Sequence, residues 1–245
     1  MITLLGTGHV FRIEEQITFI IRNIWPDALL VELDPSRYSA LKNPQPQGDV
    51  KMPWLYRRIA NYQKRIAGEY GGTAGAEMMA AIDAAMSVGA VIQFIDNNAS
   101  ETVNKMWSSM PVREKGRLLL SFMKDNKATT ADLESQLKVY SENEDFYLRE
   151  MREKFPTLVE VLIDSRNQNM AERIRAADAQ YKNIVVVIGD GHVDGIATLL
   201  SDLELRTIRL KVLMEEESMN ALRQELSSRQ KLPSDSPVGV EGDSG

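Results

Sequence analysis

The sequence lacks cysteine and has only two histidines, His9 and His192, among its 245 residues. Without cysteine the chain can form no disulfide, no thiolate metal site and no cysteine nucleophile. Any binding site for a transition metal must therefore use oxygen ligands and these two imidazoles.

Long apolar runs are also missing, because no run approaches the roughly 20 residues that a membrane span needs. The N-terminus enters the apolar segment Ile2 to Leu5 at once, with no basic region and no small-residue cleavage site. We therefore expect no integral membrane segment, and a cytoplasmic location.

A strong excess of one charge is absent from most of the chain. The formal net charge is −6, and residues 215–245 contribute most of it with seven acids and three bases. The nearly neutral remainder, residues 1–214, argues against a nucleic-acid surface. A composition of 43% hydrophobic and 26% charged residues is that of an ordinary globular protein.

The first 33 residues have the pattern of a strand, a helix and a second strand. Isoleucines on one helical face follow the apolar segment Ile2 to Leu5. Ala28 to Val31 is apolar without alternation, as in a parallel strand buried on both faces. Asp34 and Pro35 then have the residue types of a helix N-cap and a first helical residue.

Three further strand patterns occur at residues 90–95, 183–188 and 205–212. The first two have the apolar pattern of buried strands, and the last alternates as an edge strand does. Helical patterns occupy residues 54–70, 74–88, 100–180, 193–203 and 215–230, and Gly89 closes the second of them in the usual C′ place. We predict an α/β fold, with a mainly parallel sheet, flanking helices and a large helical insertion between strands three and four.

The predicted domain organisation has three parts. Residues 1–214 form one α/β domain, with the helical insertion at about residues 100–180. Residues 215–230 form a polar C-terminal helix, and residues 231–245, rich in Ser, Pro and Gly, are expected to be disordered. The amphipathic stretches of the insertion serve either the core or self-association, which leaves a homodimer open.

Both histidines occur in the pattern Gly-x-Gly-His, as Gly6-Thr-Gly-His9 and Gly189-Asp-Gly-His192. Each follows a predicted buried strand. Glycines let a strand turn sharply and leave room beside the backbone, so such a turn can present a side chain at the sheet edge. The alternative is two glycine turns whose histidines are incidental.

Acidic residues follow the other predicted strands, Glu32 the second and Asp96 the third. Ligands of open α/β sheets bind outside the carboxyl ends of the strands. Two imidazoles with carboxylates suit a divalent transition metal such as Mn, Co, Fe or Zn. Each acid has an alternative role as a helix N-cap or in an ion pair with Arg37 or Lys105.

A succession of motifs now resembles a known family. It comprises Gly6-Thr-Gly-His9, Glu32-Leu-Asp34 with Arg37, Gly75-Ala-Glu77, Arg166 with Met170, and Gly189-Asp-Gly-His192. Over about residues 1–200 this succession resembles the TraB/PrgY (pheromone-shutdown) family, which is related to the TIKI metalloproteases. The resemblance implies metal-dependent peptide hydrolysis, with the two motif histidines, a Glu and an Arg in the site.

The mechanism expected from these residues is the activation of water. His9 and His192, with one or more of Glu32, Glu77 and Asp96, would hold the metal, which lowers the pKa of bound water and polarises a carbonyl. The candidates for the general base are Glu77 and Glu32, and those for stabilising the oxyanion are Arg166 and Arg37.

Three of the candidate catalytic side chains also have plainer possible roles. Glu77 could be an acid favoured by a helix dipole, Arg37 could pair with Asp34, and Arg166 could be solvated.

The chain departs from the family pattern beside the predicted site. Asn97 and Asn98 stand where Arg-Asp is usual, Lys105 replaces an arginine, and Asn167 replaces an acid. These changes favour a second hypothesis, a non-catalytic module that keeps the fold and binds a peptide or small ligand, or signals. A third hypothesis is a haem or other cofactor carrier that uses the two histidines.

Overall fold

A computed structural model describes residues 1–8, 11–43, 75–125 and 144–230. His9, the predicted helix 54–70 and the predicted disordered tail 231–245 lie outside these residues. The described chain contains a five-stranded sheet, all of whose strand pairs are parallel, in the order β3-β2-β4-β1-β5. The strands are β1 (Ile2–Thr7), β2 (Ala28–Val31), β3 (Val91–Phe94), β4 (Ile184–Gly189) and β5 (Leu205–Ile208).

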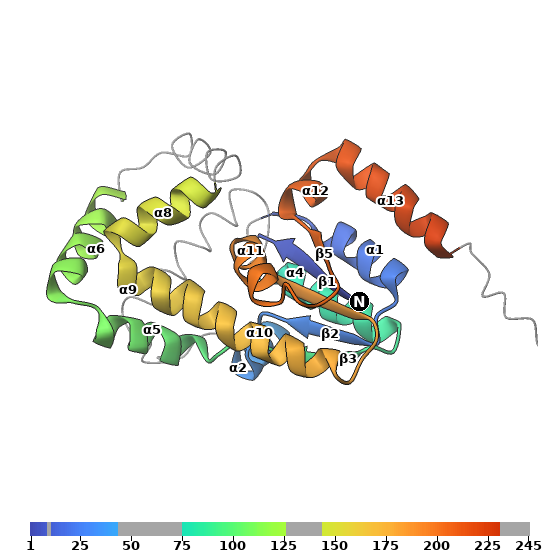
Figure 1. Ribbon diagram of the computed structural model, residues 1–245, viewed down its shortest axis with the longest axis horizontal. Coiled ribbons are helices and arrows are strands. Elements are labelled where there is room, and N and C mark those ends of the chain that lie inside the picture. The colour runs from blue at the N-terminus through green and yellow to red at the C-terminus, as the bar shows by residue number, and fades with distance from the viewer. Residues whose placement is uncertain (9–10, 44–74, 126–143, 231–245) are drawn as a thin grey trace, which may run out of the picture.

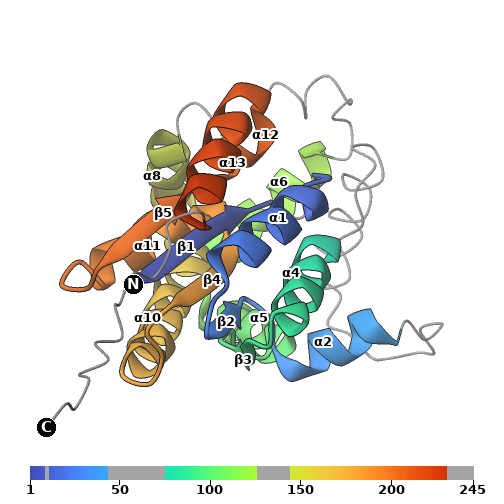
Figure 2. The same cartoon turned by 90° about the vertical axis from the view of Figure 1, so that its right-hand side faces the viewer.

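Helices cover both faces of this sheet (Figures 1 and 2). One face carries α1 (Glu14–Ile24) and α4 (Ala76–Ser87), and the other carries α10 (Ser165–Asp178) and α11 (Asp190–Leu199). The connections that run from β1 to β2 and from β2 to β3 use the first face, and those returning from β3 to β4 and from β4 to β5 use the second. A constant crossover handedness requires this arrangement, because the chain reverses direction across the sheet after β3.

Alternation along the central strands divides the core into two layers. In β4, Val185 and Val187 pack in the layer of α1 and α4, while Ile184, Val186 and Ile188 pack in the layer of α10 and α11. Successive strand side chains point to opposite faces, so a central strand must be apolar at every position. This is why these strands show uninterrupted apolar runs.

The remaining helices are short or lie at the periphery. They are α2 (Pro35–Lys42), α5 (Ala99–Ser109), α6 (Val112–Asp125), α8 (Glu144–Lys154), α9 (Pro156–Val159), α12 (Leu210–Met214) and α13 (Glu216–Gln230). Asp34 caps α2 as predicted, since its Oδ1 accepts the backbone N–H groups of Ser36 and Arg37 and Pro35 is the first helical residue. Gly89 follows α4 with φ +78°, the left-handed conformation that glycine adopts at low cost.

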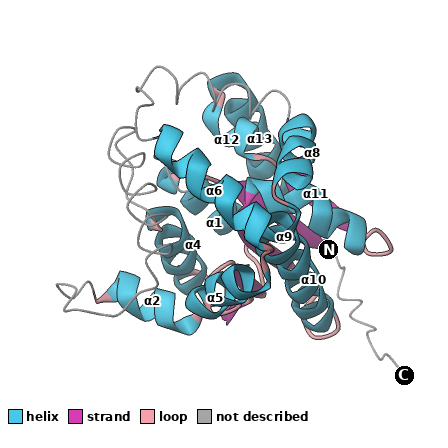
Figure 3. Ribbon diagram, turned by 90° about the vertical axis from the view of Figure 1, so that its left-hand side faces the viewer, coloured by secondary structure: helices cyan, strands magenta, loops and turns pink. Residues whose placement is uncertain are grey.

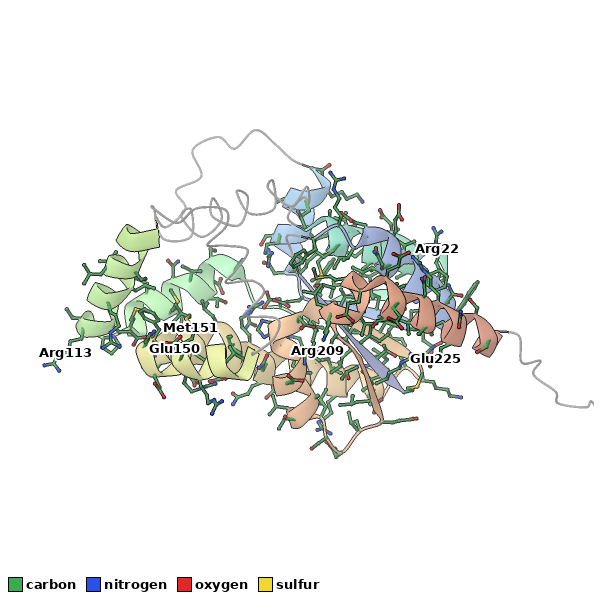
Figure 4. All side chains as sticks on the ribbon, turned by 90° about the horizontal axis from the view of Figure 1, so that it is seen from above. Arg22, Arg113, Glu150, Met151, Arg209 and Glu225 are labelled. Carbon is green, nitrogen blue, oxygen red and sulfur yellow. The ribbon has the colours of Figure 1, made fainter. Side chains whose placement is uncertain are left out.

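Helices α5, α6, α8 and α9 form a helical lobe beside the sheet (Figures 1 and 3). It has a small core of its own that includes Met106, Leu118 and Phe155. In Figure 4, Arg113 and Glu150 mark this lobe, and Arg22 and Glu225 lie at the other end of the molecule. The lobe belongs to the predicted helical insertion between β3 and β4.

Several predicted boundaries were wrong in detail. The third strand is not buried on both faces, because β3 is an edge strand whose Val91 is exposed. The predicted edge strand 205–212 ends at Ile208, and α12 follows. The helix predicted to begin near 193 begins at Asp190, so His192 lies in the first turn of α11 rather than in the turn before it. No helix in the described ranges is long and apolar enough to cross a membrane.

Candidate functional site

Glu32 follows β2 at the carboxyl edge of the sheet, and alternation sets the direction of its side chain. Ala28 and Leu30 face the layer of α10 and α11, so the next residue of the same parity, Glu32, faces it too. Its Oε2 accepts the backbone N–H of Gly189 at 2.6 Å, which ties β2 to the end of β4. The carboxylate is buried at the start of the second Gly-x-Gly-His motif.

Asp96 comes from the loop after β3 and is also buried. Its Oδ1 accepts the backbone N–H of Asn97 at 2.8 Å. Its backbone carbonyl accepts Nη1 of Arg173 at 3.1 Å, a contact that holds this loop against α10. Asp96 therefore reaches the same edge as Glu32, although it starts from the outermost strand.

Arg166 joins these two carboxylates from the first turn of α10. Its Nε and Nη2 each donate to Asp96 at 2.9 Å, and Nη2 also donates to Glu32. Its Nη1 donates to the carbonyl of Leu162 at 3.2 Å and lies 3.2 Å from Nε2 of His192. We call Glu32, Asp96, Arg166 and His192 the Arg166 cluster.

A turn of π-helix precedes Arg166. Residues Glu160–Asp164 form this π-helical segment, η1, directly between α9 and α10. Its Leu162 carbonyl is the one that Arg166 engages. Single π-helical turns are rare in proteins, and a large share of them lie at functional sites. Here the widened turn supplies a carbonyl that helps to fix the guanidinium.

The hydrogen bonds of Arg166 use its full donor capacity. A guanidinium has five N–H groups. Nε has one acceptor, Nη1 has the Leu162 carbonyl and the His192 ring, and Nη2 has the two carboxylates. The predicted role of Arg166 as the group that stabilises an oxyanion therefore requires one of these bonds to break.

The surroundings of Arg166 stabilise its positive charge. Burial opposes the charged form, but the carboxylates of Glu32 and Asp96 outweigh burial and raise the pKa of Arg166 above its ordinary value. The side chain is only 16% exposed, so water screens these interactions weakly. Arg166 is thus a fixed internal cation, and the alternative that it is simply solvated is wrong.

His192 faces the cluster on one side and Asn167 on the other. Its Nε2 lies 3.5 Å from Oε1 of Glu32, and its Nδ1 lies 2.6 Å from Oδ1 of Asn167. Both His192 and Asn167 are buried. The sequence marked Asn167 only as a departure from the family pattern. Its contact with His192 was not predicted, and the one clue to it in the sequence was that Asn167 follows Arg166 directly.

The two Gly-x-Gly-His motifs begin side by side. β1 and β4 are neighbours, with Gly6 opposite Ile188 and Thr7 opposite Gly189. A Cβ on Gly6 would overlap Oδ1 of Asp190, the residue between the two glycines of the second motif. Position 6 therefore requires glycine, because Asp190 of the other motif fills the space beside it. This contact of Asp190 was not predicted from the sequence.

Asp190 is held in turn by Arg209, which lies just before α12. Nε and Nη2 of Arg209 donate to the two carboxylate oxygens of Asp190 at 3.1 and 2.9 Å, and Nη1 donates to Asp194 at 2.7 Å. Figure 4 shows Arg209 near the centre of the molecule. We call Arg209, Asp190 and Asp194 the Arg209 cluster.

The other predicted site residues are placed less closely together. Arg37 lies at the rim of the Arg166 cluster, with Nη1 3.9 Å from Oδ2 of Asp96 and a side chain 32% exposed. Its guanidinium thus approaches Asp96 rather than Asp34. Glu77 is buried in the first turn of α4, which packs on the opposite face of the sheet from α10.

One of the two departures, Asn98, has a local structural role. At Asn97 it is the backbone N–H that donates to Asp96, a bond that does not depend on the side chain. Asn98 caps α5, since its Oδ1 accepts the backbone N–H groups of Ser100 and Glu101 at 3.1 and 3.2 Å. The uncharged side chains at these positions are therefore compatible with an intact loop after β3.

The donor chemistry of the site can be tested against a divalent metal. Within the described part of the chain, no three His, Asp or Glu side chains are grouped as a metal site requires. His192 Nε2 and Glu32 Oε1 are nevertheless 3.5 Å apart, which suits two ligands that each lie about 2.0–2.2 Å from one ion. These two atoms could hold a metal once Nη1 of Arg166 releases Nε2, whose single lone pair it now occupies, and a third ligand would come from elsewhere in the chain.

Comparison with known proteins agrees with the motif pattern. Residues 1–212 match the model of the TraB/PrgY/gumN family. The chain is also 30% identical over 214 residues to an uncharacterized protein, MJ1365, of Methanocaldococcus jannaschii. That match covers 83% of this chain and 54% of the relative, so the chain spans about half the length of the curated relative it matches. The protein belongs to the TraB/PrgY/gumN family.

Proposed function

We propose that this protein is a metal-dependent hydrolase that acts on peptides. The observation that carries the proposal is the pair formed by His192 and Glu32, with Nε2 and Oε1 3.5 Å apart at the carboxyl edge of a parallel sheet. Family membership adds support, because the resemblance implies this chemistry. Ligands of such sheets bind at this edge.

His192, Glu32 and His9 would hold the metal. Thr7 lies opposite Gly189 in neighbouring strands, so the segments that carry the two histidines leave the sheet at the same level. His9 itself is outside the described residues, and its part in the site stays a prediction. A divalent metal, for which Mn, Co, Fe and Zn are the candidates, would supply an activated water and polarise a peptide carbonyl.

Asp96 is better assigned to Arg166 than to the metal. Both of its carboxylate oxygens accept hydrogen bonds from that guanidinium. Asp96 and Arg166 together would hold Glu32 in place, because Arg166 also donates to Glu32. In this assignment Arg166 positions the site and does not contact the substrate.

We assign Arg37 to substrate binding and Glu77 to the role of general base. Arg37 is partly exposed and lies 3.9 Å from its acidic neighbour, beyond hydrogen-bond distance, so its guanidinium can bind a carbonyl or carboxylate oxygen of a peptide. Glu77 begins a helix at the same edge of the sheet, and with Glu32 assigned to the metal it would take the proton from water.

Metal content is the first test of this proposal. The untagged protein, supplied with Mn, Co, Fe(II) or Zn, should retain about one ion per chain by mass spectrometry of the metals. The variants His192→Ala and Glu32→Gln should lose it. The matched control Glu225→Gln, at a carboxylate in a surface ion pair with Arg206, should keep it.

Peptide cleavage is the second measurement on the same proteins. Cleavage should require the metal and His192, and Arg37→Gln should keep the metal while lowering kcat/KM. Folded protein that binds none of these metals and cleaves no peptide would overturn the proposal.

That negative result would favour the second candidate, a non-catalytic module that binds a peptide or small ligand. One observation favours it. The five donors of Arg166 are satisfied within the protein, so the Arg166 cluster is already a complete hydrogen-bonded unit. A self-sufficient cluster can be retained for folding alone.

A further inference from the structure

The tautomer of His192 can be deduced from its neighbours. Nη1 of Arg166 lies 3.2 Å from Nε2 of the ring. A guanidinium can only donate hydrogen bonds, so this contact is a hydrogen bond only in the ring form whose Nε2 carries no proton. In the neutral imidazole the proton then belongs to Nδ1.

Asn167 matches this tautomer on the other side of the ring. Its Oδ1 lies 2.6 Å from Nδ1 of His192, so the amide oxygen accepts the Nδ1–H. The amide could not be turned around, since its NH2 group would then face a ring N–H. Both residues are more than nine-tenths buried, so water does not compete for this bond.

Gly195 makes room for this orientation of the amide. A Cβ on Gly195 would overlap Nδ2 of Asn167. His192 and Gly195 are three residues apart on α11 and lie on the same side of that helix, where it packs against α10. The absence of a side chain at 195 lets the amide lie beside the ring.

We propose that Asn167 and Gly195 together lock His192 in the Nδ1–H tautomer and so keep Nε2 free of a proton, as the acceptor that faces Nη1 of Arg166. Asn167 is a positioning residue, because it acts on the site only through the imidazole. The use of the lone pair as a metal ligand rests on the proposed function, whereas the tautomer itself does not. Metal-binding histidines are commonly oriented in this way by a hydrogen bond at the other nitrogen.

The tautomer can be read directly by NMR, because the chain has only two histidines. Long-range ¹H–¹⁵N correlation of the full-length ¹⁵N-labelled protein should show a protonated Nδ1 and a lone-pair Nε2 for one ring. A His9→Gln variant assigns that ring to His192. A wild-type His192 protonated at Nε2 instead would overturn the proposal.

Variants test the part played by the two positioning residues. Asn167→Leu removes the acceptor and should produce a mixture of tautomers, and Gly195→Ala should do the same by displacing the amide. Asn167→Asp still accepts from Nδ1 and should keep the proton there. The matched control Asn220→Leu, at an exposed asparagine of α13, should leave the spectrum of His192 unchanged.

Metal titration separates this inference from the proposed function. With Zn²⁺ alone as the probe, Asn167→Leu should bind about 10–100-fold more weakly than the wild type. If the wild type has the Nδ1–H tautomer but binds no metal, the proposed function fails and the lock stands. An unchanged tautomer in folded Asn167→Leu and Gly195→Ala variants would refute the lock.

Discussion

Two arginine-centred clusters flank the second Gly-x-Gly-His motif, and they differ in burial. In the Arg166 cluster the arginine is 16% exposed and both carboxylates are nearly inaccessible. In the Arg209 cluster the arginine is 28% exposed, Asp190 is 15% exposed and Asp194 is 67% exposed. Arg166 donates from Nε and Nη2 to Asp96, and Arg209 donates from the same two atoms to Asp190. Each arginine also donates to a second acid, Glu32 and Asp194 respectively.

The difference in burial implies different roles. A buried cation among buried carboxylates makes strong interactions and leaves a costly unpaired charge when one partner is removed. A cluster open to water loses little of its hydration and stabilises less. The Arg166 cluster therefore fixes groups of the candidate site, while the Arg209 cluster anchors the turn that carries His192.

Removal of Arg166 should have the largest effect on stability. The variant Arg166→Met leaves two buried carboxylates without their cation, and we expect it to lose about 3–5 kcal/mol of unfolding free energy. Urea unfolding followed by circular dichroism measures this loss. Arg209→Met should lose clearly less, and equal losses in the two variants would contradict the distinction drawn from burial.

Gly6→Ala should have an intermediate effect, because it separates the two motifs. The new methyl group would overlap Oδ1 of Asp190, and relief of such crowding costs about 1–3 kcal/mol. Thermal and urea unfolding should show the loss. In a Gly6→Ala protein, the further change Asp190→Ala should cost less than it does in the wild type, since it also removes the overlap with the new methyl group.

A glycine without neighbours provides the control for this prediction. Gly116 lies inside α6, and its would-be Cβ has no described heavy atom within 4 Å apart from its chain neighbours and the backbone of its own helix. Gly116→Ala should therefore stabilise the protein by about 0.5–1 kcal/mol. A loss in both alanine variants would mean that the overlap with Asp190 is not the cause.

The smallest effect should come from an exposed pair, Arg175 and Asp202. The hydrogen bonds from Arg175 stabilise the carboxylate and lower the pKa of Asp202 to about 2. Because the folded pKa is below the unfolded value of roughly 3.9, the pair stabilises the protein fully above about pH 4 and loses this effect as the pH falls through 2.

Comparison of the wild type with Asp202→Asn across this pH range isolates the pair, since the other carboxylates titrate in both proteins. The difference in Tm should be small at pH 6, shrink in 1 M salt and vanish near pH 2. A difference that grows toward low pH would have the wrong sign for this pair.

Much of the fold could be predicted from local pattern. The β2 segment, the cap at Asp34 and the glycine after α4 were predicted at the correct residues, because burial on both faces, capping and positive φ each leave a signal within a few residues. The edge position of β3 was not predicted, since its apolar sequence resembles that of a central strand. The start of α11 inside the motif was missed because Gly-x-Gly suggests a turn.

The sequence predicted which residues belong to the candidate site, but it did not predict which of them contact one another. Glu32, Asp96 and His192 were proposed because each follows a strand at the same edge. Their common partner Arg166 is 70 residues from Asp96 and 134 from Glu32 in the chain. No spacing rule joins residues so far apart, so the saturation of Arg166 and the hydrogen bond of Asn167 could not be foreseen.

The sequence by itself determined which segments form strands, the residue types that follow them and the family, because these depend on local pattern. Only the tertiary structure decided which of these groups meet. β4 lies between β2 and β1, which brings Gly189 to Glu32 and one motif against the other. Side-chain alternation then turns Glu32 toward α10 and α11, where Arg166 and His192 lie within the same buried, weakly screened space.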